Sequence, residues 1–214
     1  MNSSLFQIQN ITFSYPKQPP LFQDFSLDIN QEDKILLTGA NGSGKSTLLA
    51  LLMGIVSPQE GNITLNDTPI PALTPEIYSE VLYSHQNARM DLFGLVPRND
   101  WELWQLAIPE KFTEKSLNLA DHDLMAKFDT PYAHLSGGEL RAFSLLWLPL
   151  LQDKFWLLDE PTSGLDAKHK TSFVDLCQNK EKRGYLIVSY DPVMEDSLFN
   201  RILLLEKGKL IQIR

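Results

Sequence analysis

The chain has 214 residues, 43% hydrophobic and 21% charged, which is ordinary for a globular protein and fits one domain with a subdomain. Its net charge is −8, from 27 acidic residues against 19 Lys and Arg, and this argues against broad nucleic-acid binding, which uses a basic face. The single cysteine, Cys177, excludes an internal disulfide and fits a reducing compartment.

Two antiparallel strands are predicted near the N-terminus. Apolar residues alternate over 5–13 and 22–29, and the proline-rich segment 16–20 predicts a turn between these strands. Residues 1–5 lack a basic segment followed by an apolar core, so we expect no signal peptide. No run reaches the ~20 apolar residues that a membrane span needs, so any membrane path must come from another chain.

A glycine-rich loop over 39–47 fits the phosphate-binding pattern G-x-x-x-x-G-K-[ST]. A buried strand is predicted over 33–38 and a helix over 46–53, so the loop lies where backbone N–H groups and a helix N-terminus favour phosphate. Lys45 is expected to reach the outer phosphates and Ser46 to bind Mg²⁺. The residues expected around the nucleotide are Gly39, Asn41, Gly42, Ser43, Gly44, Lys45, Ser46 and Thr47.

The pattern of the chain changes after residue 86. Short strands are predicted over 62–66 and 81–84, whereas 101–106 and 121–128 have a helical pattern. We therefore predict a single domain over 1–214 with two parts: a core formed by 1–86 and 135–214, and a helical subdomain formed by 87–134.

A second glycine motif, Leu135-Ser136-Gly137-Gly138-Glu139, predicts a turn that opens a helix. This helix is expected to bend or end near Pro149, because proline removes a backbone hydrogen bond and clashes with the preceding turn. Together with the first loop, the motif gives the chain two surfaces that suit nucleotide phosphates.

Two acids follow the apolar run 155–158, which predicts a buried parallel strand that ends at a polar edge. Ligands bind at the carboxyl ends of strands in open α/β sheets. Asp159 is placed to support Mg²⁺ through its water shell, and Glu160 to orient or activate the attacking water. The elements predicted after this strand are a helix over 168–182, a strand over 185–189 and a hairpin that turns at 207–209.

The order and spacing of these motifs resemble those of ATP-binding cassette (ABC) ATPases over nearly the whole chain. Tyr15 stands where that family has its adenine-stacking aromatic residue, and Gln86 matches the glutamine that links Mg²⁺ and water to the transport partner. Residues 135–139 match the family signature, with Glu139 where Gln is commoner, and 163–166 match the loop that crosses between paired subunits. The resemblance implies an α/β fold: a P-loop NTPase (RecA-like) core, an antiparallel β subdomain and an inserted α-helical subdomain.

The function that the resemblance implies is ATP hydrolysis by a transporter subunit, with ATP and Mg²⁺ as cofactors. Its partners would be a transmembrane permease and a second ABC ATPase, identical or different, and no nucleic acid. Its place would be the cytoplasmic face of the membrane, as a peripheral protein. Ser136, Gly137 and Gly138 would cap the nucleotide of the second subunit. The other implied roles are catalysis by Glu160, Gln86 and Tyr190, metal binding by Ser46, Gln86 and Asp159, and adenine stacking on Tyr15.

The segment after Gln86 supplies many apolar residues. In the family this surface accepts a short helix of the membrane subunit. We expect most of these residues to pack inside the subdomain and about two or three to contact the partner. The pattern Gln86-Asn87 followed by Asp91-Leu92-Phe93 resembles energy-coupling-factor ATPases, which serve vitamin and metal-ion uptake. The apolar residues concerned are Met90, Leu92, Phe93, Leu95, Val96, Trp101 and Trp104.

Two positions depart from the family pattern. Tyr190 replaces a histidine that touches the γ-phosphate, and Arg141 stands one place before the usual arginine. A tyrosine hydroxyl donates a hydrogen bond but cannot act as a charged switch near neutral pH. Glu160 can therefore do the chemistry with Tyr190 as a substitute donor, or the chain can be a low-turnover nucleotide-binding regulatory subunit. A soluble, non-transport ABC ATPase is the third alternative.

Overall fold

The computed structural model describes residues 4–70, 75–117 and 122–214 and contains two sheets. A four-stranded antiparallel sheet has the order β2-β1-β4-β5, and a six-stranded sheet has the order β10-β9-β3-β8-β7-β6. The first sheet comprises β1 (Ser4–Phe13), β2 (Phe22–Asn30), β4 (Glu60–Leu65) and β5 (Thr68–Pro69). The second comprises β3 (Lys34–Thr38), β6 (Val81–Ser84), β7 (Phe155–Asp159), β8 (Tyr185–Val188), β9 (Arg201–Glu206) and β10 (Lys209–Gln212).

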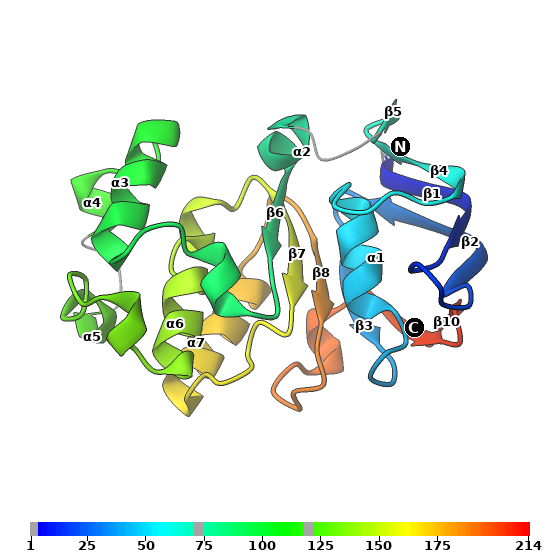
Figure 1. The fold of residues 1–214 in the computed structure, drawn as a ribbon. Coiled ribbons are helices and arrows are strands. Elements are labelled where there is room, and N and C mark those ends of the chain that lie inside the picture. The colour runs from blue at the N-terminus through cyan, green and yellow to red at the C-terminus, as the bar shows by residue number, and fades with distance from the viewer. Residues whose placement is uncertain (1–3, 71–74, 118–121) are drawn as a thin grey trace.

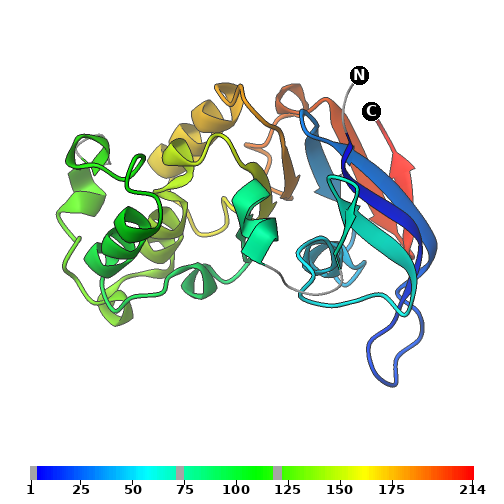
Figure 2. The same ribbon diagram turned by 90° about the horizontal axis from the view of Figure 1, so that it is seen from above.

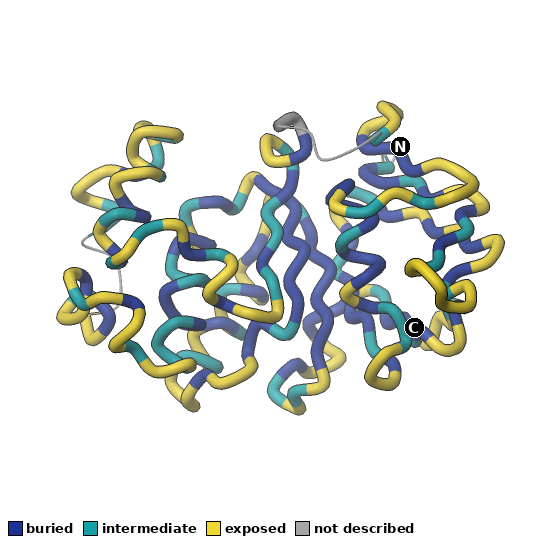
Figure 3. Tube along the Cα trace, viewed as in Figure 1, coloured by how far each residue is buried: buried dark blue, intermediate teal, exposed yellow. Residues whose placement is uncertain are grey.

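Strands β6, β7, β8, β3 and β9 are parallel, so their carboxyl ends meet at one edge of the sheet. Only β10 runs antiparallel, as the second strand of the predicted terminal hairpin. The central strands are buried on both faces, which explains why they read as continuous apolar runs. Figure 3 shows this buried centre and the exposed rim around it.

Alternate residues of the central strands serve two separate cores. On β7, Phe155 and Leu157 join the core shared with α1 (Lys45–Leu52) and the antiparallel sheet. Trp156 and Leu158 join the core shared with α6 (Gly137–Leu145) and α7 (Ala167–Gln178). The period-2 alternation of a strand therefore places α1 on one face of the six-stranded sheet and α6 and α7 on the other.

The helices between residues 97 and 125 lie at the end of the molecule opposite the antiparallel sheet (Figures 1 and 2). Between residues 87 and 134, the described residues form helices and 3₁₀ turns. Three aromatic rings of this segment pack together with the ring of Trp147, which follows α6; the three are Trp101, Trp104 and Phe112. The elements are α3 (Pro97–Ala107), α4 (Glu114–Leu117), α5 (His122–Met125), and the 3₁₀ turns η1 (Ala88–Asp91) and η2 (Tyr132–His134). The short α2 (Pro75–Glu80) leads into β6.

Proline and a buried lysine set two helix ends. Helix α6 ends at Leu145 and is followed by the 3₁₀ turn η3 (Leu148–Leu150), which contains Pro149, so the predicted stop is confirmed. Helix α7 ends at Gln178, four residues before the predicted end. Lys180 is 1% exposed and donates to the carbonyls of Gln152 and Lys154 at 2.9 and 3.0 Å, which draws the chain away from the helix.

Helix α7 also carries the single cysteine, Cys177, whose side chain is fully buried. Burial raises the pKa of its thiol to about 12. A last 3₁₀ turn, η4 (Asp196–Leu198), precedes β9. None of the helices in the described segments is long and apolar enough to span a membrane.

Candidate nucleotide site

The phosphate-binding loop connects β3 to α1 with backbone angles that favour glycine. Gly42 and Gly44 lie at φ 77° and 107°, and Gly44 is the N-cap of α1. A Cβ on Gly44 would stand 3.0 Å from the ring of Phe22. The buried hydroxyl of Ser43 has no hydrogen-bond partner among the residues that the structure describes. A tight loop with a spare hydroxyl at a helix N-terminus fits an anionic group such as a phosphate.

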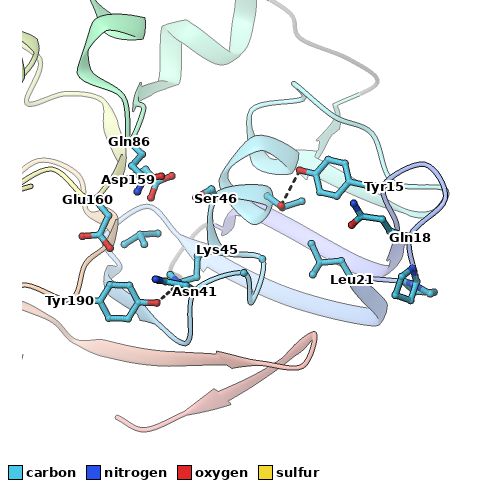
Figure 4. A pocket seen from close by; sticks show the side chains of 16 residues that line it. Tyr15, Gln18, Leu21, Asn41, Lys45, Ser46, Gln86, Asp159, Glu160 and Tyr190 are labelled. Atoms are coloured by element: carbon cyan, nitrogen blue, oxygen red, sulfur yellow. Dashed lines mark hydrogen bonds between the residues drawn. The ribbon is translucent and has the colours of Figure 1, made fainter.

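Lys45 is 7% exposed and folds back over the loop that carries it. Its ammonium donates to the carbonyls of Gly39 and Ala40 at 2.8 and 3.0 Å. It also donates to the hydroxyl of Tyr190 and lies 4.6 Å from the centre of that ring. Figure 4 shows the contact between these two side chains. The lysine is therefore held between its own loop and the segment that follows β8.

A pocket of about 510 Å³ brings most of the predicted site residues together. It lies at the carboxyl edge of the parallel strands, where Gln86 follows β6, Asp159 ends β7 and Glu160 comes directly after it (Figure 4). The predicted residues that line it are Tyr15, Asn41, Gly42, Gly44, Lys45, Ser46, Thr47, Gln86, Asp159, Glu160 and Tyr190. Gly39 and Ser43 belong to the loop but do not line the pocket.

The two acids at the carboxyl end of β7, Asp159 and Glu160, have different surroundings. Asp159 is 2% exposed, and this burial raises the pKa of its carboxyl, against a hydrogen bond from the Ser46 hydroxyl and the charge of Lys45. Burial also raises the pKa of Glu160, and the adjacent Asp159 charge adds to the effect. Glu160 lies at φ 50°, a left-handed backbone angle that is uncommon outside glycine and is found at functional sites. A half-buried carboxylate of raised pKa is suited to accept a proton from water.

The far wall of the pocket contains Tyr15, which is 39% exposed and packs edge-on against Phe13. Its hydroxyl lies 3.1 Å from Oγ1 of Thr47, so the ring is fixed beside α1 (Figure 4). The segment that follows, Gln18 to Leu21, lines the same wall and was missed by sequence reasoning. The proline-rich segment before β2 predicted a turn, but nothing in its sequence indicated that the turn would line the pocket.

Ser136, Gly137 and Gly138 lie outside this pocket. The Ser136 hydroxyl caps α6 by accepting from the Glu139 amide at 3.3 Å, and the Glu139 carboxylate accepts from the Ser136 amide at 2.8 Å. Lys127 also donates to this carboxylate, and these contacts lower the pKa of Glu139 to about 2. A Cβ on Gly138 would stand 2.5 Å from the carbonyl oxygen of Gly164, so the signature and the 163–166 loop meet where only glycine fits.

The apolar residues after Gln86 divide between core and surface. Leu92 and Trp101 are buried, and Val96 and Trp104 are partly buried. Three residues, Met90, Phe93 and Leu95, are 61%, 70% and 78% exposed. Leu103 and Leu106 on α3 are also exposed, although no sequence pattern distinguished them.

Comparison with known proteins identifies a family. A family model described as ABC transporter matches residues 22–163. A candidate ABC transporter ATP-binding protein of Onion yellows phytoplasma is 31% identical over 97% of this chain. The energy-coupling factor transporter ATP-binding protein EcfA2 of Methanospirillum hungatei is 28% identical over 97% of it. The chain spans 37% and 54% of the length of these two relatives.

The solved structures show the same fold. A dimeric ATP-binding cassette in a post-hydrolysis state, bound to ADP and Pi, has a TM-score of 0.78 and 18% identity, and the match covers 98% of this chain and 99% of that one. The predicted P-loop NTPase fold class is thereby confirmed, as is the resemblance on which it rested. The chain belongs to the ABC transporter family.

Proposed function

We propose that this chain binds Mg²⁺ and ATP in the pocket between α1 and the carboxyl ends of β6 and β7, and hydrolyses the ATP to drive a membrane transporter. The observation that carries the proposal is one pocket lined by Lys45, Ser46, Asp159, Glu160 and Gln86. Their chemistry is complementary: a cation and loop amides for phosphate, oxygen ligands for a metal, and a carboxylate for water.

Lys45 turns from the loop carbonyls to the outer phosphates when nucleotide binds, and the ring of Tyr15 stacks on the adenine. Glu160 accepts a proton from the attacking water, and the side chain of Gln86 orients that water. Tyr190 contributes a neutral hydrogen-bond donor close to the γ-phosphate. Fixed groups of this kind stabilise the charge of phosphoryl transfer without reorganising during the reaction.

The donor set at the edge of β7 fits Mg²⁺. The ion prefers oxygen ligands and keeps several waters, so it does not need a cage of protein carboxylates. Across the described ranges there is no group of three or more His, Cys, Asp or Glu that could hold a metal, which agrees with this sparse kind of site. Ser46, Asp159 and Gln86 would hold the ion, and when bound it neutralises charge on the phosphates.

Two subunits are proposed to close head to tail over two nucleotides. Because Ser136, Gly137 and Gly138 lie outside the pocket of their own chain, they are free to face the nucleotide of a second ABC subunit. The N-terminus of α6 would then donate amides to that nucleotide's γ-phosphate. Residues 163–166, which touch the signature through Gly164, would lie at the same interface.

The partner in the membrane is proposed to be a permease that docks on Met90, Phe93 and Leu95. These side chains are largely exposed next to Gln86, on a segment that would couple the site to the permease. The chain would thus be a peripheral protein on the cytoplasmic face of the membrane. The relative EcfA2 carries the name of an energy-coupling factor transporter protein, and we extend that transporter type to this chain as part of the proposal. We also propose that the chain divides into a core (1–86 and 135–214) and a helical subdomain (87–134).

The test is nucleotide-dependent association. Mg²⁺ and ATP should raise the dimer fraction of the purified chain, measured by analytical ultracentrifugation, and most strongly in Glu160→Gln, which binds ATP but cannot deprotonate water. Phosphate release should be lost in the same variant. An equal background rate of phosphate release in both proteins, with no association under ATP, would favour the low-turnover regulatory alternative.

A further inference from the structure

A buried charge cluster joins the signature helix α6 to the segment that carries Gln86. Arg141 lies on α6 and is 2% exposed. Its Nη1 stands 3.9 Å from Oδ2 of Asp91, whose side chain is 9% exposed. Charged groups are rarely buried this deeply unless they are paired, so the cluster fixes the two segments against each other.

The guanidinium of Arg141 holds the backbone from which the Gln86 side chain projects. It donates to the carbonyl of His85 at 3.0 Å and to the carbonyl of Gln86 itself. It also lies 3.3 Å from the hydroxyl of Ser84, the last residue of β6. A planar fork of donors can hold two consecutive carbonyls at once, which a single ammonium cannot do with the same geometry.

Asp91 closes the same segment from its other end. Its carboxylate accepts from the Ser84 hydroxyl at 2.7 Å and from the His85 amide at 3.0 Å. The His85 ring nitrogen Nδ1 lies 2.6 Å from the same carboxylate. Residues 84–91 are therefore held at both ends, and Gln86 lies within this loop.

We propose that Arg141 is a positioning residue that sets the placement of Gln86 according to the position of α6. The N-terminus of α6 carries Ser136 to Gly138, and Arg141 follows that N-cap by five residues, about 7 Å along the axis. A shift of α6 toward the nucleotide of a second subunit would move the guanidinium and, with it, the backbone of Gln86. This inference rests on the proposed function, in which Gln86 orients the attacking water.

The test must separate positioning from mere stabilisation. Arg141→Lys keeps the charge and removes the fork. Arg201→Lys is the matched control: Arg201 donates to the Asp28 carbonyl at 2.8 Å and to the Asp33 carboxylate, and it lies at the end of β9 that pairs with the start of β3, away from the phosphate loop.

We expect Arg141→Lys to lower kcat for ATP hydrolysis about tenfold and to leave KM for ATP within about twofold, because a loosened orienting group costs rate more than binding. Arg201→Lys should leave kcat unchanged. In a Gln86→Ala background, Arg141→Lys should cause no further loss, since both changes remove the same orientation. Fully additive losses in the double variant would overturn the inference.

Amide hydrogen exchange of the whole chain gives a readout that does not depend on turnover. The His85 amide donates to Asp91, so residues 85–91 should exchange faster in Arg141→Lys, while α7 stays as in the wild type. Unchanged exchange over 85–91 would overturn the positioning role. Equal turnover of the wild type and Glu160→Gln would instead refute the proposed function, and the exchange experiment would still decide the role of Arg141.

Discussion

Removing one hydroxyl should make this chain bind nucleotide more tightly. In the structure, Lys45 donates to the Tyr190 hydroxyl and lies over the tyrosine ring. The hydrogen bond must break before the ammonium can reach a phosphate. Tyr190→Phe removes the hydroxyl and keeps the ring, so it destabilises the state in which Lys45 is held and leaves the pocket's shape unchanged.

The size of the effect follows from the surroundings. A hydrogen bond to a charged group contributes about 1.5–3 kcal/mol. Tyr190 is 48% exposed, so solvent screening reduces the figure to about 1 kcal/mol. That free energy corresponds to about fivefold in Kd. ADP is the better ligand for the test, because it has no γ-phosphate to which the tyrosine could donate.

The assay is titration calorimetry with ADP and Mg²⁺ on the wild type and on Tyr190→Phe. The matched control is Tyr15→Phe, which removes another pocket hydroxyl that pairs with Thr47 and does not contact Lys45. We expect about fivefold tighter binding in the first variant and little change in the control. Equal or weaker ADP binding by Tyr190→Phe would refute the idea that this hydroxyl restrains Lys45.

Three further predictions concern the loop, the signature helix and a buried lysine. Gly44→Ala should weaken ADP binding and lower the melting temperature, because the residue lies at φ 107° and the new Cβ would meet Phe22 at 3.0 Å; unchanged affinity would count against this. Glu139→Ala should cost about 1 kcal/mol in the free energy of urea unfolding by removing the capping box, whereas Glu139→Gln should cost less. Burial lowers the pKa of Lys180 to about 7; the unfolded chain therefore binds more protons from pH 7 to about 10, and stability rises with pH over that window. Between pH 7 and 9 the rise in the free energy of unfolding should be about 2 kcal/mol larger in the wild type than in Lys180→Met. Parallel curves of stability against pH for the two proteins would contradict this prediction.

The local parts of the nucleotide site could be predicted from the sequence. The glycine spacing of 39–47 predicts a loop between a strand and a helix, and in the structure β3 ends at Thr38 and α1 begins at Lys45. The buried strand predicted from the apolar run 155–158 is observed as β7, which extends one residue further to Asp159. Such features depend on neighbours in the chain, so the residue order carries them.

Contacts between distant segments could not be predicted in the same way. Lys45 and Tyr190 are 145 residues apart, and Arg141 and Gln86 are 55 apart. The first contact depends on the pairing of β3 with β8, and the second on the packing of α6 against η1. No local sequence pattern encodes either arrangement. The loss of the last predicted turn of α7 has the same origin, since it follows from the carbonyls that receive Lys180.

The burial of Cys177 makes the natural chain a convenient background for labelling. A thiol with no exposed surface and a pKa near 12 forms little thiolate at neutral pH, so maleimides should leave the folded protein unmodified. A cysteine introduced at exposed Ser163 would then be the sole reactive position. Spin labels or fluorophores placed there could follow the approach of two subunits in real time, with no need to remove the native residue first.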